Sequence, residues 1–253
     1  MLVLLAAEEP TTYREAATEM MWQEAMQKEL EDIERNKTWT LTNLPSEHKP
    51  IGLKWVFKLK KNSEENVIKH KTKLVAKGYV QRQGVDFEEV FATMTRLDTV
   101  RLILALVAQH RWEVHHLDVK SAFLNGGLQE EVYVAQPEGF IIKAEEHKVY
   151  SLSKALYDLR QVLGAWNIRL EKSLKSLNFM KFSQEQAVYI RNDGVQTLIV
   201  DVYIDDLIVT DTSVEGVKEF KQQMMKEFEM TDLRLLTYYL GIEVDQRKDC
   251  ITL

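Results

Sequence analysis

The sequence contains little cysteine, proline or glycine: one, four and ten residues, respectively, among 253. The single cysteine excludes an internal disulfide and a thiolate metal site, and it is typical of a reducing compartment. The chain has no low-complexity tract, no fixed repeat and no apolar run near the roughly 20 residues that span a membrane. Its apolar start lacks preceding basic residues and is a poor signal peptide. We therefore expect an intracellular protein, cytoplasmic or nuclear, with no membrane partner.

Positive charge is not in excess either. The 33 Lys and Arg side chains against 39 Asp and Glu side chains give a net charge of −6. A nucleic-acid partner would therefore have to be held by a local basic patch rather than by bulk charge. Hydrophobic residues make up 45% and charged residues 28% of the chain, the usual balance of a folded globular protein. The length predicts one large domain or two packed subdomains.

Apolar periodicity predicts helices and strands that are mixed along the chain. Helical spacing is found over residues 13–33, 97–108, 156–177 and 214–228. Alternation or β-rich composition predicts strands over residues 54–61, 67–75, 112–119, 188–190, 197–204, 207–209 and 238–244. Short polar turns such as Asn192-Asp193-Gly194 join several of these strands as hairpins. The pattern predicts an α+β fold built around an antiparallel sheet.

Three aspartates lie at the ends of predicted strands. Asp205 and Asp206 separate two apolar strand segments, and Asp118 ends another strand just before a short helical segment. Because adjacent buried carboxylates repel, the pair is either a solvated hairpin tip or is neutralised by a divalent cation. Asp118 is equally suited to cap the following helical segment. If the three acids converge, they suit two hard cations about 3.5–4 Å apart that promote phosphoryl transfer.

A lysine-rich hairpin is predicted between residues 54 and 75. Alternation places Trp55, Phe57 and Leu59 on one face of the first strand. The opposite face carries lysines from both strands: Lys54, Lys58, Lys60, Lys69, Lys71 and Lys73. Such a face is either an ordinary solvated surface or a site for a triphosphate or a nucleic-acid backbone.

Other candidate residues carry less functional information. His115 and His116 are adjacent on a strand, so they face opposite sides and cannot share one metal ion. Trp55, Trp112 and Trp166 are expected in the core rather than as base-stacking platforms. The sequence has no glycine-rich phosphate loop, Ser-His-Asp set or zinc-ligand spacing.

Six sequence blocks together resemble the reverse transcriptase domain of Ty1/copia-type retrotransposon polyproteins, also described as retrovirus-related Pol polyproteins. The resemblance covers about residues 10–244. The blocks are WQEAM at 22–26, KWVFK at 54–58, KTKLVAKGY at 71–79, LDVKSAFLNG at 117–126, YIDD at 203–206 and YLGIEV at 239–244.

The resemblance implies an RNA-directed DNA polymerase with the fingers and palm of a right-hand polymerase and an antiparallel palm sheet with packed helices. Residues 1–95 would form the N-terminal helix and the basic fingers hairpin, and residues 96–253 the palm. The implied cofactor is Mg²⁺, with Mn²⁺ as an alternative. The implied partners are an RNA or DNA template with a primer and deoxynucleoside triphosphates, whereas the oligomeric state stays open.

The same resemblance assigns roles to individual residues. The catalytic and metal-binding acids would be Asp118, Asp205 and Asp206. The nucleotide would contact Lys60, Lys73, Phe123 and Tyr157, and Phe123 would lie under the sugar, where its ring excludes a 2′-hydroxyl. The primer and template would contact Lys58, Lys69, Lys71, Leu240, Gly241 and Ile242.

The sequence also departs from the family pattern. Asp158 and Arg234 stand at positions where the family has glycine, Val162-Leu163 replaces a Pro-containing pair, and Asp201 adds an acid to the strand before the active-site turn. Thr93-Met94-Thr95 replaces a segment that normally contains Pro-Val. An acid at 158 would repel a triphosphate by about 4 kcal/mol at 4 Å separation. Together with the expected absence of a thumb and an RNase H region, these departures predict a truncated copy with weak or no polymerase activity.

Two alternatives remain from the sequence. Besides an active polymerase, the chain could be a decayed, catalytically inactive copy that retains nucleic-acid binding, or an α+β phosphohydrolase that uses the same three acids. Primer extension with labelled deoxynucleotides separates a polymerase from both. Release of inorganic phosphate without extension would indicate the hydrolase.

Overall fold

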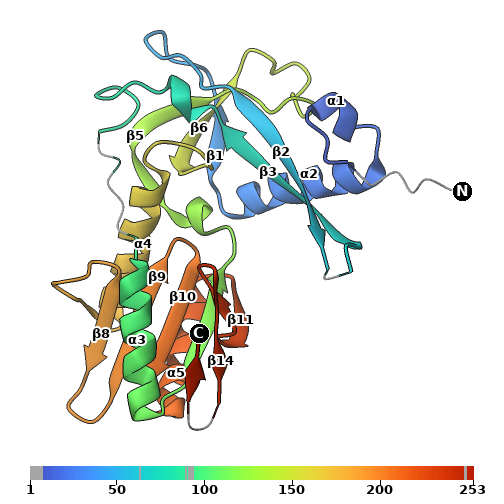
Figure 1. The fold of residues 1–253 in the computed structure, drawn as a ribbon. Helices are drawn as coiled ribbons and strands as arrows, with labels where there is room; N and C mark the ends of the chain where they lie inside the picture. Colours follow the sequence, from blue (N-terminus) through green and yellow to red (C-terminus); the bar gives the residue numbers. More distant parts are fainter. Residues whose placement is uncertain (1–7, 63, 89, 91–93, 248–249) are drawn as a thin grey trace, which may run out of the picture. The chain divides into compact units, whose positions relative to one another are not determined.

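The computed structural model describes residues 8–62, 64–88, 90, 94–247 and 250–253 of the chain (Figure 1). It divides into two compact units, Met1–Val90 with Phe123–Ala165 (unit 1) and Phe91–Ala122 with Trp166–Leu253 (unit 2). This partition differs from a single division at residue 95 in two segments: 123–165 belongs to unit 1, and 91–95 belongs to unit 2. The assignment of fingers and palm stays a prediction. Thr93, in the segment 93–95 that departs from the family pattern, lies outside the described residues.

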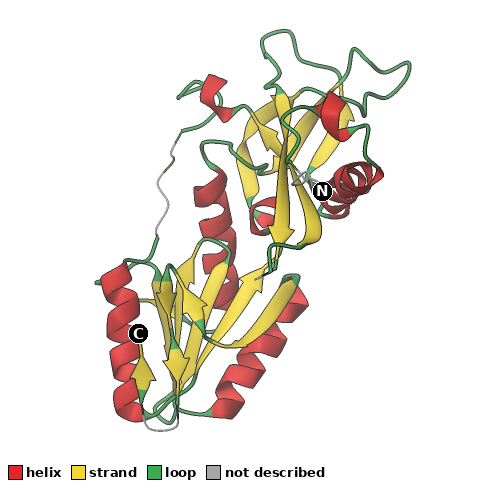
Figure 2. Ribbon diagram, turned by 45° about the vertical axis from the view of Figure 1, so that its right-hand side comes forward, coloured by secondary structure: helices red, strands yellow, loops and turns green. Residues whose placement is uncertain are grey.

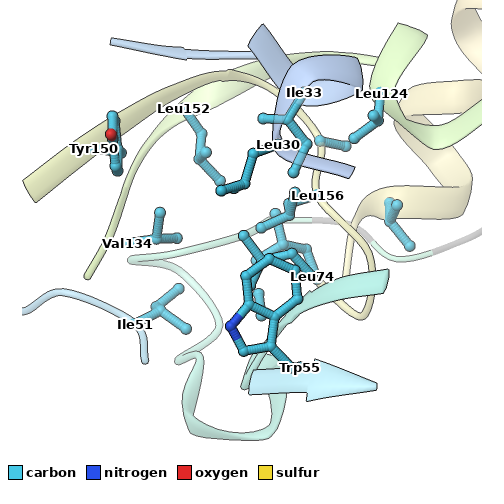
Figure 3. Packing of buried hydrophobic residues seen from close by; sticks show 14 of the residues in the cluster. Leu30, Ile33, Ile51, Trp55, Leu74, Leu124, Val134, Tyr150, Leu152 and Leu156 are labelled. Atoms are coloured by element: carbon cyan, nitrogen blue, oxygen red, sulfur yellow. The ribbon is translucent and has the colours of Figure 1, made fainter. Parts of the chain in front are cut away.

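Unit 1 combines antiparallel strands with two helices. Its elements are α1 (Tyr13–Ala16), α2 (Met20–Arg35), β1 (Trp39–Thr42), β2 (Leu53–Lys61), β3 (Val67–Ala76), the 3-10 helix η1 (Gly78–Val80), β5 (Gly127–Val134) and β6 (Val149–Lys154). One sheet has the strand order β1-β6-β5, and β2 pairs with β3 in a separate two-stranded ribbon. Helix α2 packs against β3, and both contribute to the apolar core drawn in Figure 3, where Leu30 and Ile33 lie near Leu152 and Leu156.

Unit 2 is built on a six-stranded antiparallel sheet with the strand order β11-β4-β10-β9-β8-β7 (Figure 2). Its elements are α3 (Leu97–His110), β4 (Val114–Val119), β7 (Met180–Lys181), β8 (Val188–Asn192), β9 (Thr197–Tyr203), β10 (Asp206–Asp211), α5 (Val214–Glu227), β11 (Met230–Leu235), β12 (Tyr238–Tyr239), β13 (Ile242–Glu243), β14 (Asp245–Gln246) and β15 (Ile251–Thr252). Helix α4 (Val162–Ser176) belongs to unit 2 from Trp166 onward, and the 3-10 helix η2 (Ala122–Asn125) lies at the boundary of the units.

Alternation along the strands gives this sheet two buried faces. Ile199 and Ile208 point to one face and pack with Val100, Ile103 and Leu104 of α3. The intervening residues of β9 and β10 are also buried and therefore point to the opposite face: Val200, Val202, Leu207 and Val209. Helix α5 contacts β10. The predicted α+β class with antiparallel sheets and packed helices is thus confirmed at this level.

Three predicted elements differ from the observed ones. The helix predicted over 13–33 is interrupted between α1 and α2, where the Gln23 side chain donates to the carbonyl of Ala17 (2.7 Å). The helix predicted from residue 156 begins only at Val162, because Asp158 has a left-handed φ of 69° that cannot continue a helix. The strand predicted over 238–244 is the hairpin β12–β13.

The sequence pattern does not predict seven of the observed strands: β1, β5, β6, β7, β11, β14 and β15. In the described residues, none of the helices combines the length and apolar character needed to cross a bilayer.

Candidate active site

Two of the predicted acids are direct neighbours across β4 and β10. Asp206 is the cross-strand partner of Asp118 in the antiparallel register of these strands. Cross-strand partners project from the same face of a sheet, with Cβ atoms about 4.5–5.5 Å apart. Asp205 precedes Asp206 in the tight connection between β9 and β10. The fold therefore brings all three acids to one end of the β4–β10 strand pair.

The connection between β9 and β10 has an unusual backbone. It consists of two residues, Ile204 and Asp205, and only Ile204 has a positive φ (56°). A positive φ at the first loop position alone is typical of type II′ hairpin turns, which favour glycine there. The Asp205 carbonyl accepts a hydrogen bond from the Val119 amide (2.8 Å), and the Ile204 carbonyl accepts one from the Trp166 indole (2.6 Å).

The two histidines beside this pair face opposite sides of the sheet, as their adjacency predicts. His116 Nε2 lies 2.8 Å from Asp206 Oδ1. His115 instead contacts Lys221 Nζ through Nδ1 (3.0 Å) and Glu113 through Nε2 (3.2 Å). Burial, followed by the charge of Lys221, lowers the pKa of His115. The contact with His116 involves one of the two carboxylate oxygens of Asp206.

The carboxylates of the three acids are the kind of ligand that Mg²⁺ binds. Carboxylate oxygens are the ligands that Mg²⁺ and Mn²⁺ prefer, and Asp118 with Asp206 supplies them from one face of the sheet. Within the described part of the chain, however, no three His, Cys, Asp or Glu side chains are grouped closely enough to hold a metal ion. The carboxylate donors fit a hard divalent cation in kind. That Asp118, Asp205 and Asp206 together hold one stays a prediction, with Asp206 the least certain direct ligand.

The lysine-rich ribbon of unit 1 has the two faces that the sequence predicts. Lys58 pairs with Lys71, and Lys60 pairs with Lys69, so these four side chains share one face. Trp55 and Phe57 are buried. A shallow groove on the ribbon is lined mainly by lysines, together with two apolar residues: Val56, Lys58, Leu59, Lys60, Lys71 and Lys73.

Three of the predicted nucleotide contacts lie together in unit 1. Lys73 Nζ lies 4.3 Å from the centroid of the Tyr157 ring, a cation–π contact. The Tyr157 ring meets the Phe123 ring edge to face, with 5.5 Å between centroids. Lys60 lies on the same face of the ribbon as Lys73, further toward the hairpin tip.

An acid from the start of the described chain occupies one side of the ribbon. Glu9 accepts hydrogen bonds from Lys58 Nζ (2.5 Å) and from the backbone amide of Leu59 (2.9 Å). The hydrogen bond from Lys58 holds the pKa of the Glu9 carboxyl below its usual range. A carboxylate held by one lysine and one backbone amide marks a place where a phosphate oxygen could bind.

The predicted primer contacts form the tip of the β12–β13 hairpin. Leu240 (φ 49°) and Gly241 (φ 85°) are the two turn residues, and Ile242 begins β13. Two positive φ values in a two-residue turn are typical of type I′ geometry, which glycine accommodates at its second position.

Both non-glycine residues at family glycine positions adopt left-handed backbone. Asp158 has a φ of 69°, and its carboxylate lies 3.4 Å from Lys54 Nζ. Arg234 also has a φ of 69°, beside a shift in the pairing of β11 with β4. The Asp158 carbonyl lies so close to Gly78 that a Cβ there would come within 2.0 Å of it. At both positions, where the resemblance implies glycine, the backbone has the conformation that glycine favours.

The additional acid Asp201 is completely buried in β9. Its cross-strand neighbours are Ile208 and Val188, and neither carboxylate oxygen accepts a hydrogen bond of normal geometry. Burial raises the pKa of Asp201 to about 7, and the nearby Glu185 adds to this rise. Contacts of Asp201 with the Thr95 hydroxyl and the Val202 amide oppose this rise in pKa, but neither has normal hydrogen-bond geometry, so the carboxyl is poorly satisfied in the core of unit 2.

Sequence reasoning missed three contacts near the predicted residues. They are the pair of His116 with Asp206, the binding of Glu9 to the ribbon, and the hydrogen bond from Trp166 to Ile204. The first could have been found, because a residue two positions before Asp118 on a strand shares its face. The other two join residues that are far apart in the sequence and leave no local pattern.

Comparison with known proteins identifies the family. A family model described as reverse transcriptase (RNA-dependent DNA polymerase) matches residues 36–253. The chain is 36% identical over 221 residues to a retrovirus-related Pol polyprotein from transposon TNT 1-94 of Nicotiana tabacum, and this match covers 87% of the chain and 17% of the relative. It is 35% identical over 243 residues to the corresponding polyprotein from transposon RE1 of Arabidopsis thaliana, which covers 95% of the chain and 17% of the relative.

These relatives are much longer than the chain, which spans 17% of their length. The family model nevertheless includes the lysine-rich ribbon, the three acids and five of the six sequence blocks, all except the block at 22–26. The chain belongs to the reverse transcriptase (RNA-dependent DNA polymerase) family, in the form found in Pol polyproteins of Ty1/copia-type retrotransposons.

Proposed function

We propose that the chain forms the fingers and palm of an RNA-directed DNA polymerase that extends a primer by two-metal nucleotidyl transfer. The observation that supports this most is the placement of Asp118 opposite Asp206, next to Asp205, in a chain of this family. In this proposal Asp118 and Asp206 hold the divalent cations with Asp205. A bound Mg²⁺ would neutralise phosphate charge and lower the pKa of the attacking hydroxyl.

The residues of unit 1 bind and orient the substrates in this proposal. Lys60 and Lys73 hold the triphosphate, and the contact of Lys73 with the Tyr157 ring limits where its ammonium group can lie. Phe123, packed against the same ring, selects deoxynucleotides by excluding a 2′-hydroxyl. Lys58, Lys69 and Lys71 contact backbone phosphates of the primer–template. The β12–β13 tip, with Leu240, Gly241 and Ile242, contacts the primer end.

A second candidate is a decayed copy that binds nucleic acid without catalysis. Asp158 and Arg234 in left-handed backbone, together with the buried Asp201, favour it. All three features weaken the fold rather than the acids themselves. Primer extension in the presence of Mg²⁺ or Mn²⁺ distinguishes the two candidates, and release of inorganic phosphate without extension would contradict both.

The metal site can be tested without turnover. Replacement of Asp118 or Asp205 by asparagine should abolish the increase in melting temperature that Mn²⁺ produces, because a ligand stabilises only the state that binds it. Thermal melts with and without Mn²⁺ measure this, and Asp98→Asn, an exposed aspartate on α3, is the matched control. Equal Mn²⁺ shifts in the unmodified chain and in both variants would contradict the site.

Binding by the ribbon should be electrostatic and indifferent to sequence. Primer–template affinity should fall steeply with salt, and Lys69→Ala combined with Lys71→Ala should reduce the slope of log K against log salt by about 2, since each lost phosphate contact contributes about 0.9. Fluorescence anisotropy at several salt concentrations measures the slope. Replacement of two exposed lysines elsewhere, Lys143 and Lys172, is the control. An unchanged slope in the ribbon variant would identify the lysines as ordinary solvated surface.

The contact of Glu9 with Lys58 predicts competition within the chain. Glu9→Gln should strengthen primer–template binding about threefold to tenfold, because it removes a negative charge that occupies a lysine and a backbone amide of the ribbon. The neighbouring Glu8, which is exposed, gives the control variant Glu8→Gln. The same anisotropy titration measures both, and equal affinities for the two variants would show that Glu9 does not compete.

A further inference from the structure

The turn that carries Asp205 has a backbone that its own sequence disfavours. Ile204 adopts a φ of 56°, although a β-branched residue at positive φ is a genuine outlier. Such a conformation persists only where the surrounding structure enforces it, and it is concentrated at functional sites.

Two hydrogen bonds hold the consecutive carbonyls of this turn. The Val119 amide of β4 donates to the Asp205 carbonyl (2.8 Å), which extends the strand pairing around the acids. The Trp166 indole N–H donates to the Ile204 carbonyl at 2.6 Å, a short hydrogen bond. The first bond comes from the sheet itself, whereas the second reaches the turn from helix α4.

The tryptophan is held firmly enough to act as an anchor. Its side chain is completely buried, and its ring packs edge to face on Phe228, with 5.3 Å between centroids. An indole N–H buried in this way needs an acceptor, and the Ile204 carbonyl provides one. Loss of the bond would therefore leave a buried donor unsatisfied as well as release the turn.

The Ile204 carbonyl belongs to the peptide plane that joins Ile204 to Asp205. Because β9 and β10 are paired on both sides of the turn, relaxation of Ile204 to a negative φ must be absorbed by rotation of the peptide planes that flank this residue, and the hydrogen bond from the indole opposes rotation of the plane that carries the Ile204 carbonyl. The same rotation would redirect the Asp205 side chain relative to the Asp118–Asp206 pair. A hydrogen bond at this carbonyl therefore controls the direction of an acid that it does not touch.

We propose that Trp166 is a positioning residue of the candidate active site, which fixes the strained Ile204–Asp205 peptide and thereby the direction of the Asp205 carboxylate. The inference rests on the proposed function only for the role of Asp205. The hydrogen bond from the Trp166 indole to the Ile204 carbonyl can be tested in the chain whether or not the chain catalyses.

Trp166→Phe removes the indole N–H and keeps an aromatic ring in the core. Hydrogen exchange measured by NMR should show the Val119 amide exchanging about tenfold faster, the change expected from loss of one buried hydrogen bond. The amides of Leu207 and Val209, further along β10, should keep their rates. Acceleration that is equal at all these amides would indicate only a general loss of stability and would overturn the proposal.

Trp55→Phe is the matched control. Trp55 is also buried, and its indole donates to a backbone carbonyl, that of Glu138 at 3.1 Å, within unit 1. This variant should leave Val119 exchange unchanged. In the unmodified chain, the Trp166 indole proton should itself be among the slowest of the tryptophan indole protons to exchange, and rapid exchange there would overturn the proposal without any variant.

The strain supplies a rescue test. Glycine accommodates positive φ without strain, so in an Ile204→Gly background residue 204 has no backbone strain that favours a change of the turn. Trp166→Phe should therefore accelerate Val119 exchange less in that background than in the unmodified chain. Equal effects in both backgrounds would show that the indole does not oppose the strain at Ile204, and would overturn the proposal.

Mn²⁺ titration tests whether the Trp166–Ile204 hydrogen bond affects metal binding by the acids. The apparent Mn²⁺ affinity from thermal shifts should weaken about tenfold in Trp166→Phe and stay unchanged in Trp55→Phe. If the unmodified chain shows no Mn²⁺ shift, the proposed function fails, while the exchange data still decide whether Trp166 holds the turn. A normal Mn²⁺ affinity in Trp166→Phe would overturn its role as a positioning residue.

Discussion

Asp201→Val should raise the free energy of unfolding at pH 8 by about 4 kcal/mol relative to the unmodified chain. The unfolded chain releases this proton near the usual aspartate value of 3.8, whereas burial raises the pKa in the folded chain to about 7. A difference of about three pKa units corresponds to about 4 kcal/mol of penalty for the charged form. Valine suits the site because the neighbours Val188 and Ile208 are apolar.

The pH dependence has a definite direction. Between pH 3.8 and 7 the folded state holds one proton more than the unfolded state at this residue. The free energy of unfolding therefore decreases by about 1.4 kcal/mol per pH unit as pH rises. The stabilising contribution of the protonated carboxyl is fully present below pH 3.8 and is lost as pH rises through 7.

Urea denaturation at pH 5, 6, 7 and 8 measures this effect as a difference between two proteins. The unmodified chain minus Asp201→Asn isolates the titration of residue 201, because Glu29, whose pKa burial also raises to about 7, is present in both. Asp98→Asn is the control for an exposed aspartate. A difference that stays constant with pH would show that the Asp201 carboxyl is hydrated or paired in the folded chain.

The sequence predicted best the features that depend on neighbouring residues. Alternation placed the lysines of the β2–β3 ribbon on one face and Trp55 with Phe57 on the other, and adjacency placed His115 and His116 on opposite faces. These predictions follow from the two-residue period of a strand and need no tertiary information. The positions of the three acids at predicted strand ends identified them without the family, and the resemblance added their expected role as catalytic metal ligands.

The predictions that failed involve residues whose burial comes from distant contacts. Leu156 and Leu159 are buried at helical spacing, but they lie before α4, and the left-handed Asp158 separates them. The segment 238–244 alternates like one strand, although Leu240 turns it back on itself. The anchor from Trp166 to Ile204 spans 38 residues and could not be read from either segment alone.

The structure changes the expected effect of Asp158 on nucleotide binding. From the sequence, an acid at this position would repel a triphosphate by about 4 kcal/mol. Its carboxylate instead lies 3.4 Å from Lys54 Nζ, and the side chain is 57% exposed. Pairing and solvent screening both reduce the repulsion, since an exposed ion pair contributes at most about 1 kcal/mol. We therefore expect Asp158→Gly to strengthen deoxynucleotide binding by less than about tenfold.

The larger consequence of Asp158 and Arg234 concerns stability. Both have a φ of 69°, and left-handed backbone disfavours a residue with a Cβ by about 1–2 kcal/mol relative to glycine. Asp158→Gly and Arg234→Gly should each stabilise the chain by about 1 kcal/mol, after allowance for the greater entropy of glycine in the unfolded state. The gain should be smaller at Asp158, since aspartate tolerates this region better and glycine would lose the contact with Lys54.

Urea denaturation of the single and double variants measures these gains. The two positions lie in different units, so their effects should add in the double variant wherever unfolding is two-state. Thr231→Gly on the same strand as Arg234 is the control; Thr231 lacks a positive φ and should lose stability. If the double variant also extends a primer that the unmodified chain does not, the acids are intact and the weakness lies in the fold. Stabilisation without extension would instead favour the decayed copy, and no stabilisation at either position would contradict the backbone argument itself.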